Sequence, residues 1–281
     1  MKLFKSDVKT KEILEWEGIH LLNFKFSACS IKTRIYLNLK KIPYQSHQIN
    51  LSKGENFSEW FQGINPRSLV PVLIDDGDVH IESNDILLYL EEKFEANPLI
   101  PVGEKEEVDE LLKFEDDLHT DIRNITFKFI VPKFLNKGHL PKPKSKNKAT
   151  LHGKEDILDD TNRNYWNEYE KSGIKDTDVR RSIKRLKNSL NEIDKKLEKN
   201  EFILGFSLSL IDIAWFIYVT RLKDAKYPLG ELHPNVARWY ESLIRIDEFS
   251  REIKKPLIME IIANINNFFL NLQKKGIRHL L

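Results

Sequence analysis

The first hundred residues alternate between short apolar runs and longer runs in which apolar positions follow helical spacing. Short apolar runs bounded by turn residues are typical of strands, whereas apolar positions three and four apart are typical of helices. This order of elements predicts a small α/β domain with a mixed sheet. The predicted strands are 19–24, 43–51, 70–75 and 79–81, and the predicted helices are 30–41, 56–64 and 83–94.

After residue 101 the strand pattern almost disappears and helical spacing dominates. Between 178 and 199 apolar residues recur every three or four positions, which predicts a strongly amphipathic helix. A Pro-, Lys- and Ser-rich stretch at 139–154 predicts a mobile basic loop. This part of the chain is therefore predicted to be all-helical. Its other helices are expected at 105–135, 209–223, 233–246 and 256–275.

The change of pattern divides the chain into an extension and two domains. Residues 1–18 form an N-terminal extension, 19–97 the α/β domain and 104–281 the all-helical domain. An insertion at about 136–177, with several aromatic residues, lengthens the helical domain.

Composition narrows the functions open to the chain. Its 281 residues include 45 Lys and Arg against 43 Asp and Glu, for a formal net charge of +2. This balance argues against nucleic-acid binding. The single cysteine, Cys29, excludes an internal disulfide and a cysteine-based metal centre. We expect no metal site.

Signals for export or membrane insertion are missing from the pattern. Residues 1–18 mix both charges and lack the apolar core of a secretory signal. No apolar run reaches about 18 residues, the length needed to span a bilayer. We therefore expect a cytoplasmic protein without a membrane-spanning segment, in which helix 256–275 packs in the core or in a dimer rather than on a membrane.

The first candidate site is Ser27-Ala28-Cys29-Ser30, between the first strand and the first helix. A helix N-terminus offers unpaired N–H groups and the positive end of the helix dipole, which stabilise an anion. Ser27 or Ser30 can act simply as a helix cap. Cys29 can be a thiol with a lowered pKa or a small buried apolar residue. The residues alone leave these alternatives open.

The second candidate is the proline at the start of the strand at 70–75. Proline removes a donor from the strand ladder, so its place in an inner strand needs a reason. A cis Val70–Pro71 bond would supply one and would present the Val70 main chain to an extended peptide. The alternative is a trans proline that opens an edge strand.

The third candidate is Glu82-Ser83, at the start of the helix at 83–94. Ser83 and the helix N–H groups can bind a carboxylate, and Glu82 can receive an ammonium group. Together they would hold the end of an α-amino acid. The alternative is that Ser83 only caps the helix.

Four fragments, in this order, resemble the glutathione transferase superfamily. They are Ser27–Ser30, INPRSLVPVL at 64–73, ESNDILLYLEEKF at 82–94, and SLIDI at 209–213. The first is most similar to the zeta-type Ser-Ser-Cys-Ser motif, with Ala28 in place of the middle serine. Ser209 and Asp212 in the last fragment form a capping-box pattern that we assign to folding. The insertion resembles that of beta-etherase-type transferases.

The resemblance implies a thioredoxin-like N-terminal domain, an all-helical C-terminal domain, glutathione as co-substrate and a homodimer. On this match Ser27 takes the position of the catalytic serine, while a beta- or omega-type reading would make Cys29 the key residue. The resemblance makes a cis Val70–Pro71 bond the expected form. Val70 and Pro71 would pair with the glutathione main chain, and Glu82 and Ser83 would hold its γ-glutamyl end. For the glycyl carboxylate the candidates are Lys53, Gln48 and His47.

The implied reaction is attack of the glutathione thiolate on a hydrophobic electrophilic small molecule, held by the helical domain. Two alternatives remain: a glutathione-dependent thiol oxidoreductase that uses Cys29, and a transferase-like interaction module without turnover. The candidates for the electrophile's pocket are Phe114, His119, Ile122 and Phe129.

Overall fold

The structure is a computed structural model that describes residues 1–131 and 149–281. The chain forms two compact units. Unit 1 comprises Met1–Phe94 and Lys137–Ser172, and unit 2 comprises Glu95–Asn136 and Gly173–Leu281. Unit 1 carries a mixed sheet and unit 2 is helical, so the predicted fold class is confirmed.

The sheet of unit 1 has four strands in the order β2-β1-β3-β4. β1 runs parallel to β2 and antiparallel to β3, and β3 runs antiparallel to β4. The predicted strand at 43–51 is present but shorter. The bounds are β1 (Ile19–Asn23), β2 (Gln45–Gln48), β3 (Val72–Asp75) and β4 (Asp78–Ile81).

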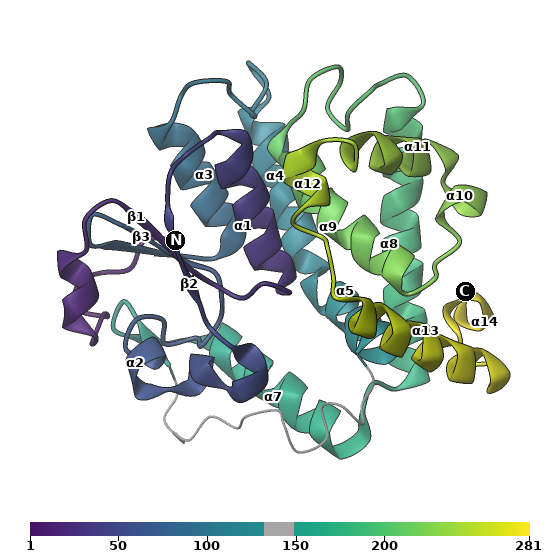
Figure 1. Cartoon of the computed structure of the whole chain (residues 1–281), viewed down its shortest axis with the longest axis horizontal. Helices are drawn as coiled ribbons and strands as arrows, with labels where there is room; N and C mark the ends of the chain where they lie inside the picture. The colour runs from purple at the N-terminus through teal and green to yellow at the C-terminus, as the bar shows by residue number, and fades with distance from the viewer. Residues whose placement is uncertain (132–148) are drawn as a thin grey trace. The chain divides into compact units, whose positions relative to one another are not determined.

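Helices cover both faces of this sheet (Figure 1). Because side chains alternate along a strand, neighbouring residues face opposite layers. His80 stacks on Tyr89 of α3, whereas Leu22 and Val72 join a core cluster with Phe61 of α2. The helices of this unit are α1 (Ala28–Leu39), α2 (Glu59–Gln62) and α3 (Ser83–Lys93), with 3₁₀ turns η1 (Lys11–Glu15), η2 (Leu51–Lys53) and η3 (Glu55–Phe57).

The N-terminal extension is part of the body of unit 1. Lys2 forms an antiparallel bridge with His80 of β4, so the extension covers the outer edge of that strand. Leu3, Val8 and Ile13 are buried in the core cluster. The extension thus removes an open strand edge, which would otherwise be a site for pairing with another chain.

The insertion contributes a hairpin and a helix that group with unit 1. These are β5 (Thr150–Leu151), β6 (Lys154–Glu155) and α7 (Ile157–Ser172). Leu151 joins the unit 1 core, and the ring of His152 stacks on Phe4 with centroids 4.0 Å apart. Residues 149–154 of the expected loop therefore form most of a hairpin, while 139–148 lie outside the described residues. The sequence division had included the insertion in the helical domain.

Unit 2 is built around α9, whose residues are nearly all buried. Asp212 forms the expected capping box with Ser209 and also accepts hydrogen bonds from Ile203 N at 2.9 Å and Trp239 Nε1 at 2.8 Å. Burial raises the pKa of Asp212, and these hydrogen bonds oppose the rise. The elements are α4 (Lys105–Asp117), α5 (His119–Ile125), the π-helix η4 (Thr126–Ile130), α8 (Asp176–Leu197), α9 (Leu210–Asp224), α10 (Leu229–Leu232), α11 (Pro234–Leu243), α12 (Asp247–Ser250), α13 (Leu257–Leu272) and α14 (Ile277–Leu280).

Gly77, in the turn between β3 and β4, permits the close approach of the extension. Its φ is +79°, and a Cβ there would lie 2.2 Å from the carbonyl oxygen of Leu14. Gly18 has nearly the same φ, +78°, but a Cβ there would meet nothing within 4 Å. A comparison of alanine substitutions at the two positions therefore separates the cost of the left-handed backbone from the cost of the steric clash with Leu14.

We expect Gly18→Ala to lower the free energy of unfolding by about 1 kcal/mol, through its left-handed conformation alone. Gly77→Ala should cost about 2 kcal/mol more, because the Leu14 backbone must move. Urea unfolding of the two variants measures the difference. Equal midpoints would show that the extension does not pack against this turn.

Candidate functional site

The candidate segments of unit 1 converge at one end of its sheet. Val72, near the start of β3, pairs with Leu22 near the end of β1 and with Ile81 at the end of β4. Asn23 at the end of β1 pairs with Gln48 at the end of β2. The segments that follow β1, β2 and β4, and the segment that precedes β3, therefore leave the sheet at the same edge. They contain all seven residues predicted for the site.

Ser27 occupies the N-cap of α1, one of the two capping positions that the sequence left open. Its Oγ accepts a hydrogen bond from Ser30 N at 3.4 Å, and the Ser27 side chain is partly exposed. Cys29, the second residue of the helix, is also partly exposed, so it is not the buried apolar residue considered from the sequence. Ser30 is fully buried, and its Oγ accepts from Phe24 N at 3.3 Å. Ser27 and Cys29 are therefore the two groups of this motif that a ligand can reach.

Arg34 holds the loop that leads into α1. Its buried guanidinium donates to Asn23 Oδ1 at 2.8 Å and to the Lys25 carbonyl at 2.9 Å. Gln48 completes this network: its amide donates to Asn23 Oδ1 at 3.0 Å and accepts from Lys25 N at 3.2 Å. A charged donor with several fixed acceptors restricts the loop strongly. Gln48 thus has a role in positioning the segment before Ser27.

His47, the neighbour of Gln48 in β2, points to the opposite face of the sheet from Gln48. Its Nε2 is 2.9 Å from His20 Nδ1, and its ring stacks on Trp16 with centroids 4.7 Å apart. Burial, and to a lesser extent His20, lower the pKa of His47. Lys53 is exposed at the end of η2. Gln48 is also exposed, but its amide is held by Asn23 and Lys25; Lys53 is the exposed candidate that carries a positive charge.

The loop before β3 is held by side-chain amides. Asn65 Nδ2 donates to the Leu69 carbonyl at 2.8 Å, and Asn56 Nδ2 donates to the Ser68 carbonyl at 2.9 Å. The Val70–Pro71 peptide bond is cis, as predicted.

Glu82 and Ser83 begin α3, but their capping roles differ from the prediction. Glu82 occupies the N-cap with φ +66°, and Ser83 is the first helical residue rather than the cap. Ser83 is buried. Glu82 Oε1 accepts from Arg67 Nη1 at 2.5 Å, and among the described residues the other carboxylate oxygen, Oε2, has no partner. That oxygen remains open to a ligand.

Arg67 is a site residue that the sequence reasoning missed. It joins Glu82 to Asp156, with Nε 2.5 Å from Asp156 Oδ2 and Nη2 3.0 Å from Asp156 Oδ1. Burial lowers the pKa of Arg67, but the two carboxylates outweigh this effect and raise it above the ordinary value. Arg67 lies inside the fragment 64–73, which offered a signal. Asp156 comes from the insertion, where no local pattern marked it.

α1 and α3 are tied together by buried polar groups. Lys32, only 1% exposed, donates to Asn84 Oδ1 at 2.7 Å. The Tyr36 hydroxyl donates to Glu91 Oε2 at 2.6 Å, and burial together with Glu91 raises the pKa of Tyr36. A buried charge that lost its partner would be strongly destabilising. These contacts therefore hold the two helix starts, with Ser27 and Ser83, in a fixed relation.

The four pocket candidates of unit 2 separate into surface and core. Phe114 is partly exposed and lines a cavity of about 330 Å³ with Trp215. Ile122 and Phe129 are buried in the core. His119 is half-buried, and its Nδ1 lies 3.5 Å from the Tyr218 hydroxyl. Phe114 is thus the candidate that reaches a cavity. Within the described ranges, no cluster of His, Cys, Asp and Glu could hold a metal ion.

Comparison with known domains identifies both parts of the chain. Residues 26–93 match the family described as Glutathione S-transferase, N-terminal domain, and residues 176–242 match Glutathione S-transferase, C-terminal domain. A zeta-class glutathione S-transferase of Euphorbia esula is 45% identical over 83 residues, 30% of this chain and 37% of the relative. The theta-1 transferase of Mus musculus is 27% identical over 217 residues, 74% of this chain and 75% of the relative.

Solved structures share the fold. A beta-etherase of Sphingobium sp. gives a TM-score of 0.69 at 22% identity, over 85% of this chain and 100% of that one. A thioredoxin-like sheet domain and a helical domain in this order define the two-domain transferase class. The chain therefore carries the N- and C-terminal domains of the glutathione S-transferase superfamily. It spans 37% to 39% of the length of the first three curated relatives that it matches.

The Arg67–Asp156 pair can be tested by removing one charge. Their side chains are 9% and 8% exposed, so Asp156→Asn leaves a buried guanidinium with Glu82 alone. Breaking a buried ion pair from one side costs about 3 kcal/mol or more. Urea unfolding should show this loss, whereas Lys154→Gln, at an exposed position two residues away, should change stability by less than about 0.5 kcal/mol. If both variants match the wild type, Asp156 does not anchor the insertion.

Proposed function

We propose that this protein is a glutathione transferase that activates the thiol of glutathione with Ser27. The observation that carries the proposal is the convergence of Ser27, Val70-Pro71 and Glu82-Ser83 at one edge of the sheet. It is supported by the two matched domains. It is also supported by a Pseudomonas fluorescens family member solved with two glutathione molecules, which has a TM-score of 0.62 at 20% identity over 86% of this chain and 94% of that one.

Ser27 acts on the sulfur of glutathione. Its Oγ accepts from Ser30 N, and among the described residues its hydroxyl proton has no acceptor. That O–H donates to the glutathione sulfur and, with the N-terminal end of α1, stabilises the thiolate. The thiol proton passes to solvent. The thiolate then forms a bond to an electrophilic carbon, and the leaving group departs with its electron pair.

The remaining groups orient the tripeptide. The Val70 main chain pairs with its cysteinyl residue, and Pro71 shapes this segment. Glu82 Oε2 receives the α-ammonium of the γ-glutamyl group, while Ser83 and the N–H groups of α3 bind its carboxylate. Lys53 binds the glycyl carboxylate. Arg67 holds Glu82 through Oε1 and so leaves Oε2 turned to the ligand.

The second substrate is a hydrophobic electrophile, for which Phe114 is the candidate contact in unit 2. The protein is proposed to be a cytoplasmic homodimer, as is common among relatives of this superfamily. Conjugation, ether cleavage, isomerisation and dehalogenation all begin with the same thiolate, so the Ser27 assignment holds for each of them.

Cys29 gives a second candidate function. Because its thiol is partly exposed in the first turn of α1, it could form a mixed disulfide with glutathione and then be released by a second thiol. The protein would then be a thiol oxidoreductase. A module without turnover is the third possibility, and retention on immobilised glutathione followed by a conjugation assay separates it from both enzymes.

Substitution of the two residues distinguishes the enzymes. We expect Ser27→Ala to lower kcat/KM for conjugation of an activated aryl halide by about 100-fold, the cost of one lost donor to a developing anion. The rising limb of its pH profile should move to higher pH, because the bound thiol loses stabilisation of its charged form. Cys29→Ala, the matched control, should stay within about threefold of the wild type.

The opposite pattern would identify the oxidoreductase. If Cys29→Ala abolished disulfide exchange with a glutathionylated peptide while Ser27→Ala left it intact, the serine assignment would be wrong. Glutathione binding by calorimetry, measured on both variants, separates loss of chemistry from loss of the ligand site.

A further inference from the structure

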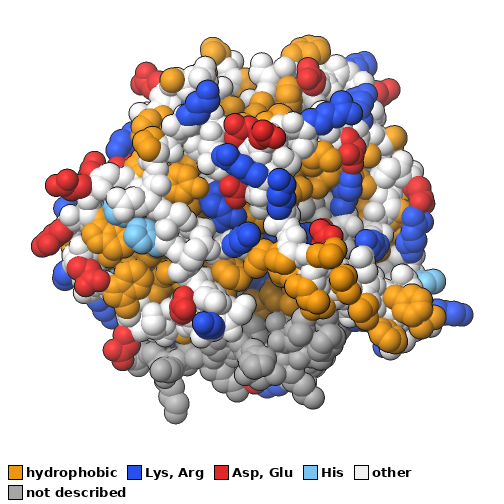
Figure 2. Space-filling view, in the orientation of Figure 1, with side chains coloured by type: hydrophobic (Ala, Val, Ile, Leu, Met, Phe, Trp, Pro, Cys, Tyr) orange, Lys and Arg blue, Asp and Glu red, His pale blue; other side chains and the backbone are white. Residues whose placement is uncertain are grey.

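α13, in unit 2, presents an apolar side to solvent. At about 100° per residue, the exposed apolar side chains of this ridge span roughly 100° of the helix circumference. Figure 2 shows them as a continuous hydrophobic ridge. Soluble monomers rarely expose contiguous apolar patches larger than a few hundred Å². The ridge residues, each 43% to 66% exposed, are Ile258, Ile261, Ile265, Phe268, Phe269 and Leu272.

The inner side of the same helix mixes amides with apolar residues: Ala263 and Asn267 are buried, and Ile262 and Leu270 are partly buried. Asn266 Nδ2 and Asn267 Nδ2 donate to the Phe129 carbonyl of η4 at 2.9 and 3.1 Å. Helices on globular proteins ordinarily bury their apolar side. Here a rotation that buried the ridge would break both amide bonds. The two amide bonds help to hold this orientation. Core packing of the ridge, one of the two expectations for this helix, is wrong because the ridge is exposed; the other, contact in a dimer, stays a prediction.

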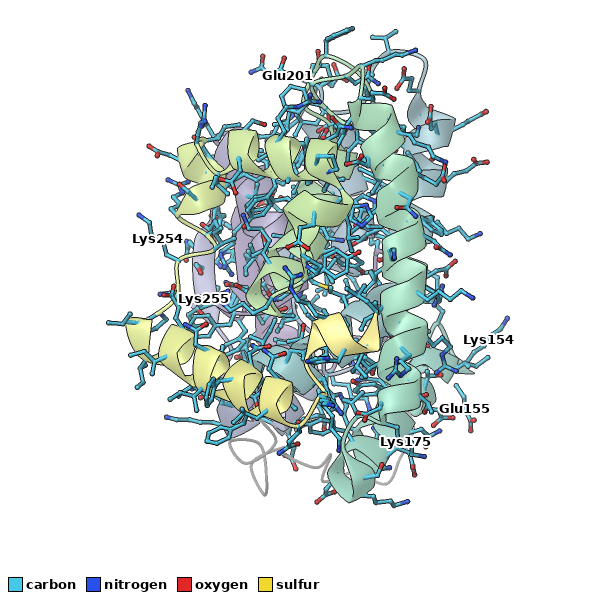
Figure 3. All side chains as sticks on the ribbon, turned by 90° about the vertical axis from the view of Figure 1, so that its right-hand side faces the viewer. Lys154, Glu155, Lys175, Glu201, Lys254 and Lys255 are labelled. Atoms are coloured by element: carbon cyan, nitrogen blue, oxygen red, sulfur yellow. The ribbon has the colours of Figure 1, made fainter. Side chains whose placement is uncertain are left out.

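Cations flank the ridge at both ends. Lys254 precedes α13, Lys274 and Lys275 follow it, and all three side chains are exposed. Figure 3 shows Lys254 and Lys255 in the segment that enters the helix. Glu260 is the one acidic residue within α13. An apolar stripe between lysines complements a surface that is apolar inside and anionic at its boundary.

The charges argue against a second copy as the occupant. In an antiparallel pair of α13 helices, Lys254 of one copy would approach Lys274 and Lys275 of the other. In a parallel pair, Lys254 of one copy would approach Lys254 of the other, and the lysines at the C-terminal ends would also approach each other. Both arrangements bring like charges together, which is unfavourable. Anionic lipid headgroups would instead pair with the lysines.

We propose that α13 is an interfacial helix that binds the surface of an anionic membrane. It would lie in the plane of the interface, with the ridge among the upper acyl chains and the lysines at the headgroups. None of the helices in residues 1–131 and 149–281 is long and apolar enough to cross a bilayer. The inference does not depend on the proposed chemistry, because α13 contains none of the site residues.

The test is flotation of the full chain with phosphatidylcholine vesicles, with and without 30% phosphatidylserine. We expect strong binding only to the mixed vesicles. The variant I261S/I265S/F268S should reduce the partition coefficient at least tenfold. Phe206→Ser removes an exposed aromatic ring outside α13 and should leave binding unchanged. All these side chains are exposed, so circular dichroism and the thermal midpoint should stay unchanged.

Neutralising the lysines tests the electrostatic part. K254Q/K274Q/K275Q should lower binding to the anionic vesicles by roughly fivefold per charge at low salt, and added salt should weaken wild-type binding in the same way. Absence of wild-type flotation, or unchanged flotation of the ridge variant, would overturn the proposal. A concentration-dependent dimer lost in the ridge variant, without vesicle binding, would assign the ridge to a second copy.

Discussion

The candidate site depends on the register of one residue, Val72. This residue pairs with β1 on one side and with β4 on the other, so it places the ends of both strands beside the start of β3. A slip of one residue would exchange the two faces of the sheet. His80 would then leave Tyr89, and Leu22 would leave the core cluster. Packing on both faces therefore fixes the register, and the register assembles the site.

Around this edge, buried cations hold the loops in place. Arg34 fixes the segment before Ser27, Lys32 ties α1 to α3, and Arg67 connects Glu82 to the insertion. Each cation has a nearby carbonyl, amide or carboxylate oxygen, which offsets the cost of removing it from water. The result is a rigid support beneath groups that remain accessible, the arrangement that precise binding requires.

Local patterns predicted the parts of this structure that have local causes. The apolar runs marked β1, β3 and β4, and the spacing of Ser209 and Asp212 marked the start of α9. The cis peptide bond before Pro71 needed the family resemblance. The convergence of the predicted site residues also followed from the element order once the strands were paired.

Other features depend on distant contacts that no local pattern records. Arg67 and Asp156 are 89 positions apart in the sequence. The apolar residues of the extension follow neither strand nor helix spacing, so their burial was not predicted. For α13 the apolar pattern predicted packing in the core or in a dimer, and it did not show which side of the helix would be exposed. The side that packs inward is held by two amide hydrogen bonds to the Phe129 carbonyl, which is a distant contact.

The path of the chain through the two units has a consequence for biosynthesis. Unit 1 is not a continuous segment: it closes only when the hairpin and α7 return to it after the chain has entered unit 2. During translation, residues 1–94 would emerge without Asp156 and Leu151, so Arg67 would lack its main partner. The sheet domain can reach its final form only after residue 172 has left the ribosome. Completion of its fold is thus coupled to synthesis of more than half of the chain.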